Sequence, residues 1–154
     1  MKPIEIRDAT PGDYFAIRSL LAAERLPLDG VAPDSPARFF VAVNSQEIVG
    51  CVAFETYASD GLLRSLAVDA TVRGAGLGRR LARRIEHEAA NVGIQNFYVL
   101  TTTAAAYFKK LGYAATERGI VPGLVRASAQ FAAICPESAA CLSKHCERLA
   151  GDLA

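Results

Sequence analysis

The stretch Arg73-Gly74-Ala75-Gly76-Leu77-Gly78-Arg79 decides the fold, because it joins an apolar segment to a long amphipathic one. Glycines let a backbone close tightly, so that several N–H groups converge at the start of the following helix. The partial positive charge of a helix N-terminus favours a phosphate group there. The stretch is no P-loop, since no Gly-Lys-Ser/Thr follows, and its third glycine comes one residue too early for a dinucleotide fingerprint. A glycine-rich turn without a ligand is the alternative interpretation.

The segments on either side of this stretch predict a β-α-β unit. Residues 62–68 form an apolar strand, and residues 77–92 carry Leu77, Leu81 and Ile85 at helical spacing. A further apolar strand is predicted over 96–101. Two strands joined by one helix run parallel in a sheet, so the outer strands of this unit are expected to pair in parallel.

The rest of the chain predicts an antiparallel meander and further short elements. Tight turns at 44–46 and 59–61 separate strands at 38–44 and 47–57 from the strand at 62–68. The remaining predicted elements are strands at 4–7, 113–116 and 138–143, and helices near 11–24 and over 103–111. We therefore expect a single α/β domain over 1–154, with one mixed sheet and helices on both of its faces.

Composition excludes several classes of protein. The chain has 154 residues, 51% of them apolar, and a formal net charge of +1. This balance gives no field that would attract a nucleic acid or an anionic membrane. The sequence contains neither a signal-peptide pattern nor an apolar run long enough to span a membrane. Four irregularly spaced cysteines do not make a disulfide framework, so a reduced, cytoplasmic environment is expected.

The pattern Arg-x-x-Gly-x-Gly after Leu66-Ala67-Val68 resembles the acyl-CoA signature of the GNAT acetyltransferase superfamily. The run from Tyr107 to Tyr113 is similar to that family's second signature. The resemblance covers nearly the whole chain. It implies a mostly antiparallel twisted sheet with one splayed parallel strand pair, and acetyl-CoA as the co-substrate without a metal ion.

The resemblance also assigns cofactor-binding residues. Backbone amides of the turn would hold the CoA pyrophosphate, and the contacts fall on Arg73, Gly74, Ala75, Gly76, Leu77, Gly78 and Arg79. Backbone groups of Leu66, Ala67 and Val68 would line the pantetheine arm, and one of those amides would polarise the acetyl carbonyl. Many family members place an acid tyrosine where this sequence has Phe108, which is itself expected among the cofactor-binding residues. Tyr107 lies one position earlier, about 100° away around the helix. Tyr107 is thus a reserve candidate for the general acid, and packing beside the cofactor is the alternative.

Candidate acceptor residues flank the notch that this fold leaves between the strands at 62–68 and 94–101. Arg64 interrupts an apolar strand and needs an anionic or hydrogen-bonding partner, either a substrate carboxylate or an internal acid. Glu55 is the candidate general base, which would bind the ammonium group and remove a proton. Thr101 and Thr102 are weaker candidates for contacts with the acceptor.

The carboxy-terminal third suggests a narrower resemblance, to the arsenic-resistance-associated branch of GNAT N-acetyltransferases. Amino-acid N-acetyltransferases of the acetylglutamate-synthase type share its Leu-Thr-Thr run at 100–102. Both comparisons imply a small acceptor with an α-amino acid group. Cys135, Cys141 and Cys146 lack the close pairing of a zinc site, and buried apolar cysteines are the more common alternative to a metalloid site.

The predicted function is transfer of an acetyl group from acetyl-CoA to a small, amino-acid-like amine. One alternative acceptor is a protein N-terminus or a lysine side chain. A non-catalytic CoA-binding or metalloid-sensing module is another alternative. Self-association as a homodimer is compatible with the sequence.

Overall fold

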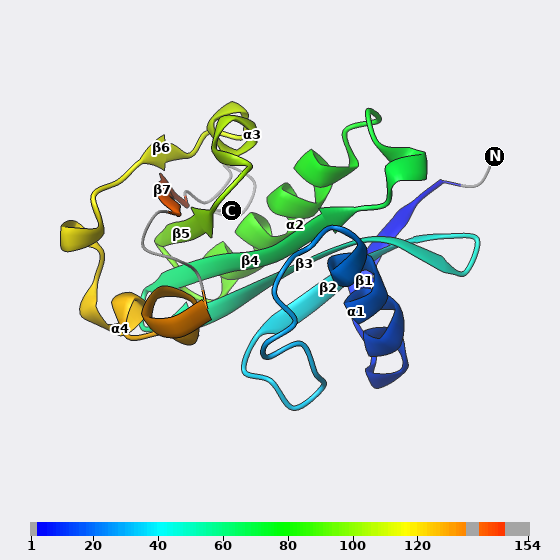
Figure 1. Cartoon of the computed structure of the whole chain (residues 1–154), viewed down its shortest axis with the longest axis horizontal. Helices are drawn as coiled ribbons and strands as arrows, with labels where there is room; N and C mark the ends of the chain where they lie inside the picture. The colour runs from blue at the N-terminus through cyan, green and yellow to red at the C-terminus, as the bar shows by residue number, and fades with distance from the viewer. Residues whose placement is uncertain (1–2, 135–138, 147–154) are drawn as a thin grey trace. The chain divides into compact units, whose positions relative to one another are not determined.

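The computed structural model describes residues 3–134 and 139–146, and its seven strands form one mixed sheet in the order β1-β2-β3-β4-β5-β7-β6 (Figure 1). The chain divides into two compact units. Unit 1 consists of Met1–Glu55 and Arg64–Ile85, and unit 2 consists of Thr56–Leu63 and Glu86–Ala154. The α/β class and the mixed, mostly antiparallel sheet are confirmed. A single domain over 1–154 stays a prediction.

Unit 1 contains three antiparallel strands whose bounds agree closely with those predicted from the sequence. β1 (Glu5–Asp8) pairs with β2 (Arg38–Asn44), and β2 pairs with β3 (Glu47–Tyr57). Ser45 and Gln46 form the turn between β2 and β3, both with positive φ. The predicted bounds of β2 and β3 are confirmed because this turn and the long buried runs beside it mark the strand ends in the sequence.

Helix α1 (Tyr14–Ala23) covers one face of these strands (Figure 1). Its buried residues Ile17, Leu20 and Leu21 share a core with alternate residues of β2 and β3, among them Phe39 and Cys51. The side chains of every second strand residue point to the same face, so one helix can bury this whole set. The apolar stripe of α1 is therefore what fixes the helix to the sheet.

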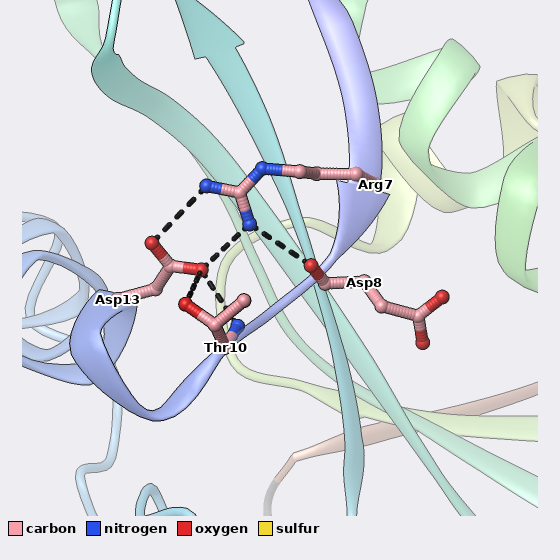
Figure 2. Close-up of polar contacts among 4 residues, drawn as sticks. All are labelled: Arg7, Asp8, Thr10 and Asp13. Atoms are coloured by element: carbon pink, nitrogen blue, oxygen red, sulfur yellow. Dashed lines mark hydrogen bonds and ion pairs between the residues drawn. The ribbon is translucent and has the colours of Figure 1, made fainter.

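A short 3-10 helix, η1 (Pro11–Asp13), leads into α1 and is anchored by ion pairing (Figure 2). The Asp13 carboxylate accepts hydrogen bonds from the guanidinium of Arg7 at 2.7 and 3.2 Å, and from the backbone N–H of Thr10 at 2.7 Å. The hydrogen bond from Arg7 lowers the pKa of Asp13 to about 2. The start of the helix is thereby tied to β1.

The beginning of helix α2 (Leu77–Asn91) covers the opposite face of the strands in unit 1. Leu81 lies so close to Gly50 that an added Cβ at Gly50 would be 3.0 Å from Leu81 Cδ1. The guanidinium of Arg84 lies 5.3 Å from the centre of the Phe40 ring. Helices on both faces of the sheet are thus confirmed within unit 1.

Unit 2 is organised around strand β5 (Asn96–Thr101). The first residues of β4 (Asp60–Val68) run parallel to it, with Asp60 opposite Asn96, which confirms the predicted parallel pair. On its other side β5 pairs antiparallel with β7 (Ala140–His145), and β7 pairs with the two-residue strand β6 (Ala114–Ala115).

The helices that follow β5 are short. They are α3 (Ala105–Lys110), η3 (Arg118–Ile120), α4 (Gly123–Arg126) and the π-helix η4 (Gln130–Ile134). The predicted helix 103–111 is too long, because the hydroxyl of Thr101 bonds the N–H groups of Thr103 and Ala104 before α3 starts. β7 extends two residues beyond its predicted end at 143, and its predicted start at Ser138 lies outside the described residues. In the described part of the chain, no helix is long and apolar enough to cross a membrane.

Candidate active site

The glycine-rich turn leaves its backbone open at the start of α2. Gly74 and Gly76 have φ values of +87° and +80°, a region that favours glycine. Among the described residues, no atom lies within 4 Å of a Cβ built at either position. The first N–H groups of an α-helix have no partner within the helix itself. The turn therefore offers exposed main-chain donors at the positive end of a 15-residue helix.

Contacts on either side hold the turn in place. Before it, the Asp69 carboxylate accepts hydrogen bonds from the backbone and hydroxyl of Thr71, at 2.9 and 2.7 Å, and caps the 3-10 helix η2 (Ala70–Val72). The Nε atom of Arg73 donates to the carbonyl of Val68 at 3.2 Å, and its Nη2 atom forms an ion pair with Glu24. These contacts fix the path of the chain from β4 into α2.

Strand β4 has an unusual backbone conformation at Ser65, immediately before the predicted pantetheine-binding residues. Ser65 has a φ of +58°, which is unusual for a residue other than glycine. Its carbonyl accepts a hydrogen bond from the thiol of Cys51 at 3.3 Å. Burial raises the pKa of Cys51 to about 12, so this thiol stays protonated and can donate. The backbone of Leu66, Ala67 and Val68 thus follows a strained residue that the core supports.

Arg64 and Glu55 form a buried ion pair in unit 1. Arg64 Nη1 lies 3.0 Å from Glu55 Oε2, and the two side chains are 4% and 8% exposed. The Nε atom of Arg64 donates to the hydroxyl of Ser65 at 3.1 Å, and its Nη2 atom donates to the carbonyl of Asp29. An internal acid is thus the partner of Arg64 in this structure. The roles of Arg64 in acceptor binding and of Glu55 as general base stay predictions.

The other candidate residues lie in unit 2. Phe108 is buried and packs edge-to-face against both Tyr107 and Tyr113, with ring centres 5.9 and 5.6 Å apart. Tyr107 is 40% exposed, and Thr102 is exposed as well. The hydroxyl of Thr101 accepts the 2.9 Å hydrogen bond from the N–H of Ala104. The roles of these residues in binding the cofactor and the acceptor stay predictions.

Arg80 and Arg84 of α2 are a like-charged pair at i and i+4, and each has a hydrogen-bond partner elsewhere in unit 1. Arg80 donates to the carbonyl of Ile4 at 2.9 Å, and Arg84 donates to the carbonyl of Ile6 at 2.8 Å. The carbonyl of Ile6 belongs to β1 and that of Ile4 immediately precedes this strand, so both contacts offset the repulsion between the two arginines. Arg79, the predicted cofactor contact, lies exposed in the first turn of the helix.

The cysteines do not form a cluster in the part of the chain that is described. Cys51, Cys141 and Cys146 are free thiols, and Cys135 lies outside the described residues. Within residues 3–134 and 139–146, no group of three or more Cys, His, Asp or Glu side chains is arranged to hold a metal ion. Burial raises the pKa of the Cys146 thiol to about 12.

Sequence patterns alone do not reveal the residues that surround Arg64. Asp29 and Gly30 belong to the stretch 26–31, which the sequence predicts only as a loop, and no role is predicted for Arg18 or Cys51. The Asp-Gly dipeptide could have suggested a tight turn that approaches another element. No sequence signal connects Asp29 to Arg64, because the two residues are 35 positions apart in the chain.

Comparisons with known proteins agree with this geometry. The model of the acetyltransferase (GNAT) domain family matches residues 35–115, which include the glycine-rich turn. The IAA acetyltransferase of Azospirillum brasilense is 37% identical over 119 residues, which cover 72% of this chain and 74% of that protein. The amino-acid acetyltransferase of Ralstonia nicotianae is 31% identical over 118 residues, which cover 70% of this chain and 26% of that protein.

A solved structure shares the fold over almost the whole chain. It is the N-acetylglutamate synthase of Neisseria gonorrhoeae, complexed with coenzyme A and N-acetyl-glutamate. The TM-score is 0.79 at 22% sequence identity, and the match covers 96% of this chain and 36% of the synthase chain. The family match, the relatives and the fold agree, and the chain therefore belongs to the GNAT acetyltransferase family and is an acyltransferase.

Proposed function

We propose that the protein transfers the acetyl group of acetyl-CoA to the amine of a small, amino-acid-like acceptor, by direct attack in a ternary complex. One observation carries the proposal: the open, exposed main chain at Gly74 and Gly76, placed at the N-terminus of α2. A diphosphate fits such a site because converging N–H groups and the helix dipole both favour negative charge. The backbone of 66–68 would then lie along the pantetheine arm.

The acceptor class is supported by the relatives and by the local chemistry. The relative from Ralstonia is an amino-acid acetyltransferase, and the solved neighbour was crystallised with N-acetyl-glutamate. This chain spans only about a quarter and a third of those two proteins, 26% and 36%. Its acceptor therefore has to be established on this chain itself. An arsenic-containing amino acid, implied by the narrower resemblance, is one member of the proposed class.

The proposed chemistry needs little acid catalysis. A thiol with a pKa of about 8.5 is a good leaving group, so departure of CoA does not require a phenol at the position of Phe108. The enzyme would contribute by positioning the thioester and an uncharged amine, which raises their effective concentration. Glu55 is the proposed group that receives the proton of the ammonium, and Tyr107 is the reserve candidate for the acid. Turnover in the reduced cytoplasm is consistent with the free thiols.

Thermal unfolding with and without acetyl-CoA tests the turn. A ligand at one hundred times its Kd adds about 2.7 kcal/mol to the free energy of unfolding, so Tm should rise with acetyl-CoA. Gly76→Asp should abolish this rise, because a carboxylate would then stand where the phosphates bind. Gly93→Asp is the matched control: Gly93 has a φ of +91°, is equally open, and lies at the other end of α2.

The control should lose stability without ligand and still respond to acetyl-CoA. A full rise of Tm in Gly76→Asp would remove the turn from the proposal.

The acceptor is then found by measuring CoA release with α-amino acids, amino-acid arsenicals, polyamines and peptides. Release with peptides alone would favour the alternative, acetylation of proteins. No release with any amine would favour a CoA-binding module without catalysis.

A further inference from the structure

Each nitrogen of the Arg64 guanidinium group donates a hydrogen bond to the chain itself. Nη1 is paired with Glu55 at 3.0 Å, Nη2 donates to the carbonyl of Asp29, and Nε donates to the hydroxyl of Ser65 at 3.1 Å. The side chain is 4% exposed. Three separate parts of unit 1 thus meet at one cation: the end of β3, the segment 28–31, and the left-handed residue of β4.

The segment 28–31 is fastened from a second side by Arg18 of α1. Arg18 Nη1 donates to the carbonyls of Leu28 and Val31, at 3.2 and 3.0 Å. The backbone N–H of Val31 donates to the carbonyl of Leu28 at 3.1 Å, and the Val31 side chain is buried. The segment is therefore a defined turn whose carbonyl groups are held by two arginines.

The turn also has the backbone that a close approach to Arg64 requires. Gly30 has a φ of +72°, and a Cβ at this position would lie 3.1 Å from Arg64 Nη1. Any side chain here would strain the backbone and push against a buried guanidinium group. The absence of a side chain at Gly30 thus makes room for the guanidinium group of Arg64. The sequence alone does not show that these two residues are in contact.

We propose that Arg64 is a positioning residue, which locks the 28–31 turn to β4 at Ser65 and at the same time holds the Glu55 carboxylate in place. Its kinetic consequence rests on the proposed function, because Glu55 and the backbone after Ser65 belong to the proposed machinery. The lock itself is a property of the folded chain, with or without a substrate.

The alternative role of Arg64 is that of a carboxylate clamp, in which its guanidinium group binds the carboxylate of the substrate. A substrate carboxylate would have to share the guanidinium group with Glu55, and two carboxylates on one buried cation repel each other. It would also have to compete with the carbonyl of Asp29, which reaches Arg64 from the chain itself. The observed partners favour a lock, and the two roles predict different results.

Hydrogen exchange of the Val31 amide tests the lock without any enzymatic reaction. Arg64→Lys keeps the charge for Glu55 but cannot reach three partners at once, so exchange at Val31 should become about tenfold to a hundredfold faster. Gly30→Ala should have the same effect by displacing the guanidinium group. The amide of Leu26, which donates to the carbonyl of Leu21 at 2.9 Å, should change little. Gly93→Ala controls for the cost of a positive φ alone.

Unchanged exchange at Val31 in both Arg64→Lys and Gly30→Ala would overturn the lock. Steady-state kinetics of the active enzyme then distinguish a positioning role of Arg64 from direct binding of a substrate carboxylate. If Arg64 positions the site, Arg64→Lys should change kcat and KM by the same factor for an amino acid and for the matching amine without a carboxylate. A KM that rises only for the acceptor with a carboxylate would establish the clamp instead. If no amine is acetylated at all, the proposed function fails, and the exchange result still decides the lock.

Discussion

Gly30 and Gly76 share a left-handed backbone but differ in what surrounds them. At Gly30, with a φ of +72°, a Cβ would lie 3.1 Å from the guanidinium group of Arg64. At Gly76, with a φ of +80°, the described residues place no atom within 4 Å of a Cβ. The first glycine makes room for a side chain of the protein itself. The second leaves a space that the described residues do not fill, which is what a ligand site requires.

The same contrast separates Gly61 from Gly74. Gly61 is buried in β4 opposite Phe97, and a Cβ there would lie 2.6 Å from Phe97 Cε1. Gly74 has open surroundings and a φ of +87°. Stability should therefore depend strongly on the packed positions, at Gly30 beside Arg64 in unit 1 and at Gly61 in unit 2, and only weakly on the turn. Coenzyme binding should show the opposite dependence.

The largest effect on stability is expected from Glu55→Ala. This change leaves the buried guanidinium group of Arg64 without its anionic partner, and removing one member of a buried pair costs about 3–5 kcal/mol. Urea denaturation measures the loss in the free energy of unfolding. Glu55→Gln keeps a hydrogen-bond acceptor at the same place and should lose less. If both variants unfold like the wild type, the ion pair between Glu55 and Arg64 contributes nothing to the free energy of unfolding.

Gly61→Ala should have the next largest effect. The new methyl group meets the Phe97 ring, which is 0% exposed, so either the ring or the strand must shift. Overpacking of this kind costs about 1–3 kcal/mol. The measurement is again urea denaturation, with Gly123→Ala as the control at an open position. Equal midpoints for Gly61→Ala and its control would show that β4 adapts to the methyl group.

Local signals in the sequence explain which parts of the fold were predicted. The turn at Ser45 and Gln46 and the buried runs beside it fix β2 and β3. The repeat of Leu77, Leu81 and Ile85 fixes α2, which ends at Asn91. The region after Gly112 contains helices of three to five residues, η3, α4 and η4, whose lengths are too short for a helical period to show. Their existence was accordingly not predicted.

The candidate site also has one part that local sequence signals predict and one part that they do not. The turn at 73–78 can be recognised in the sequence, because closely spaced glycines before an amphipathic helix form a local pattern. One partner of Arg64 is distant in the chain, since Asp29 precedes it by 35 positions. The sequence shows that a buried arginine needs a partner, and only the structure shows which groups supply it. The hydrogen bond from the Cys51 thiol to the carbonyl of Ser65 spans 14 positions and has no sequence signal either.

The smallest effects on stability are expected from Gly74→Ala and Gly76→Ala. Alanine in a left-handed conformation costs roughly 1–2 kcal/mol, and no clash adds to this cost at an open position. Gly93→Ala should cost about the same, since Gly93 has a φ of +91° and open surroundings. Urea denaturation without ligand should thus give three similar losses, and only the two turn variants should change the Kd for CoA. A loss in Gly76→Ala well above that in Gly93→Ala would mean that the protein itself, and no ligand, requires the glycine there.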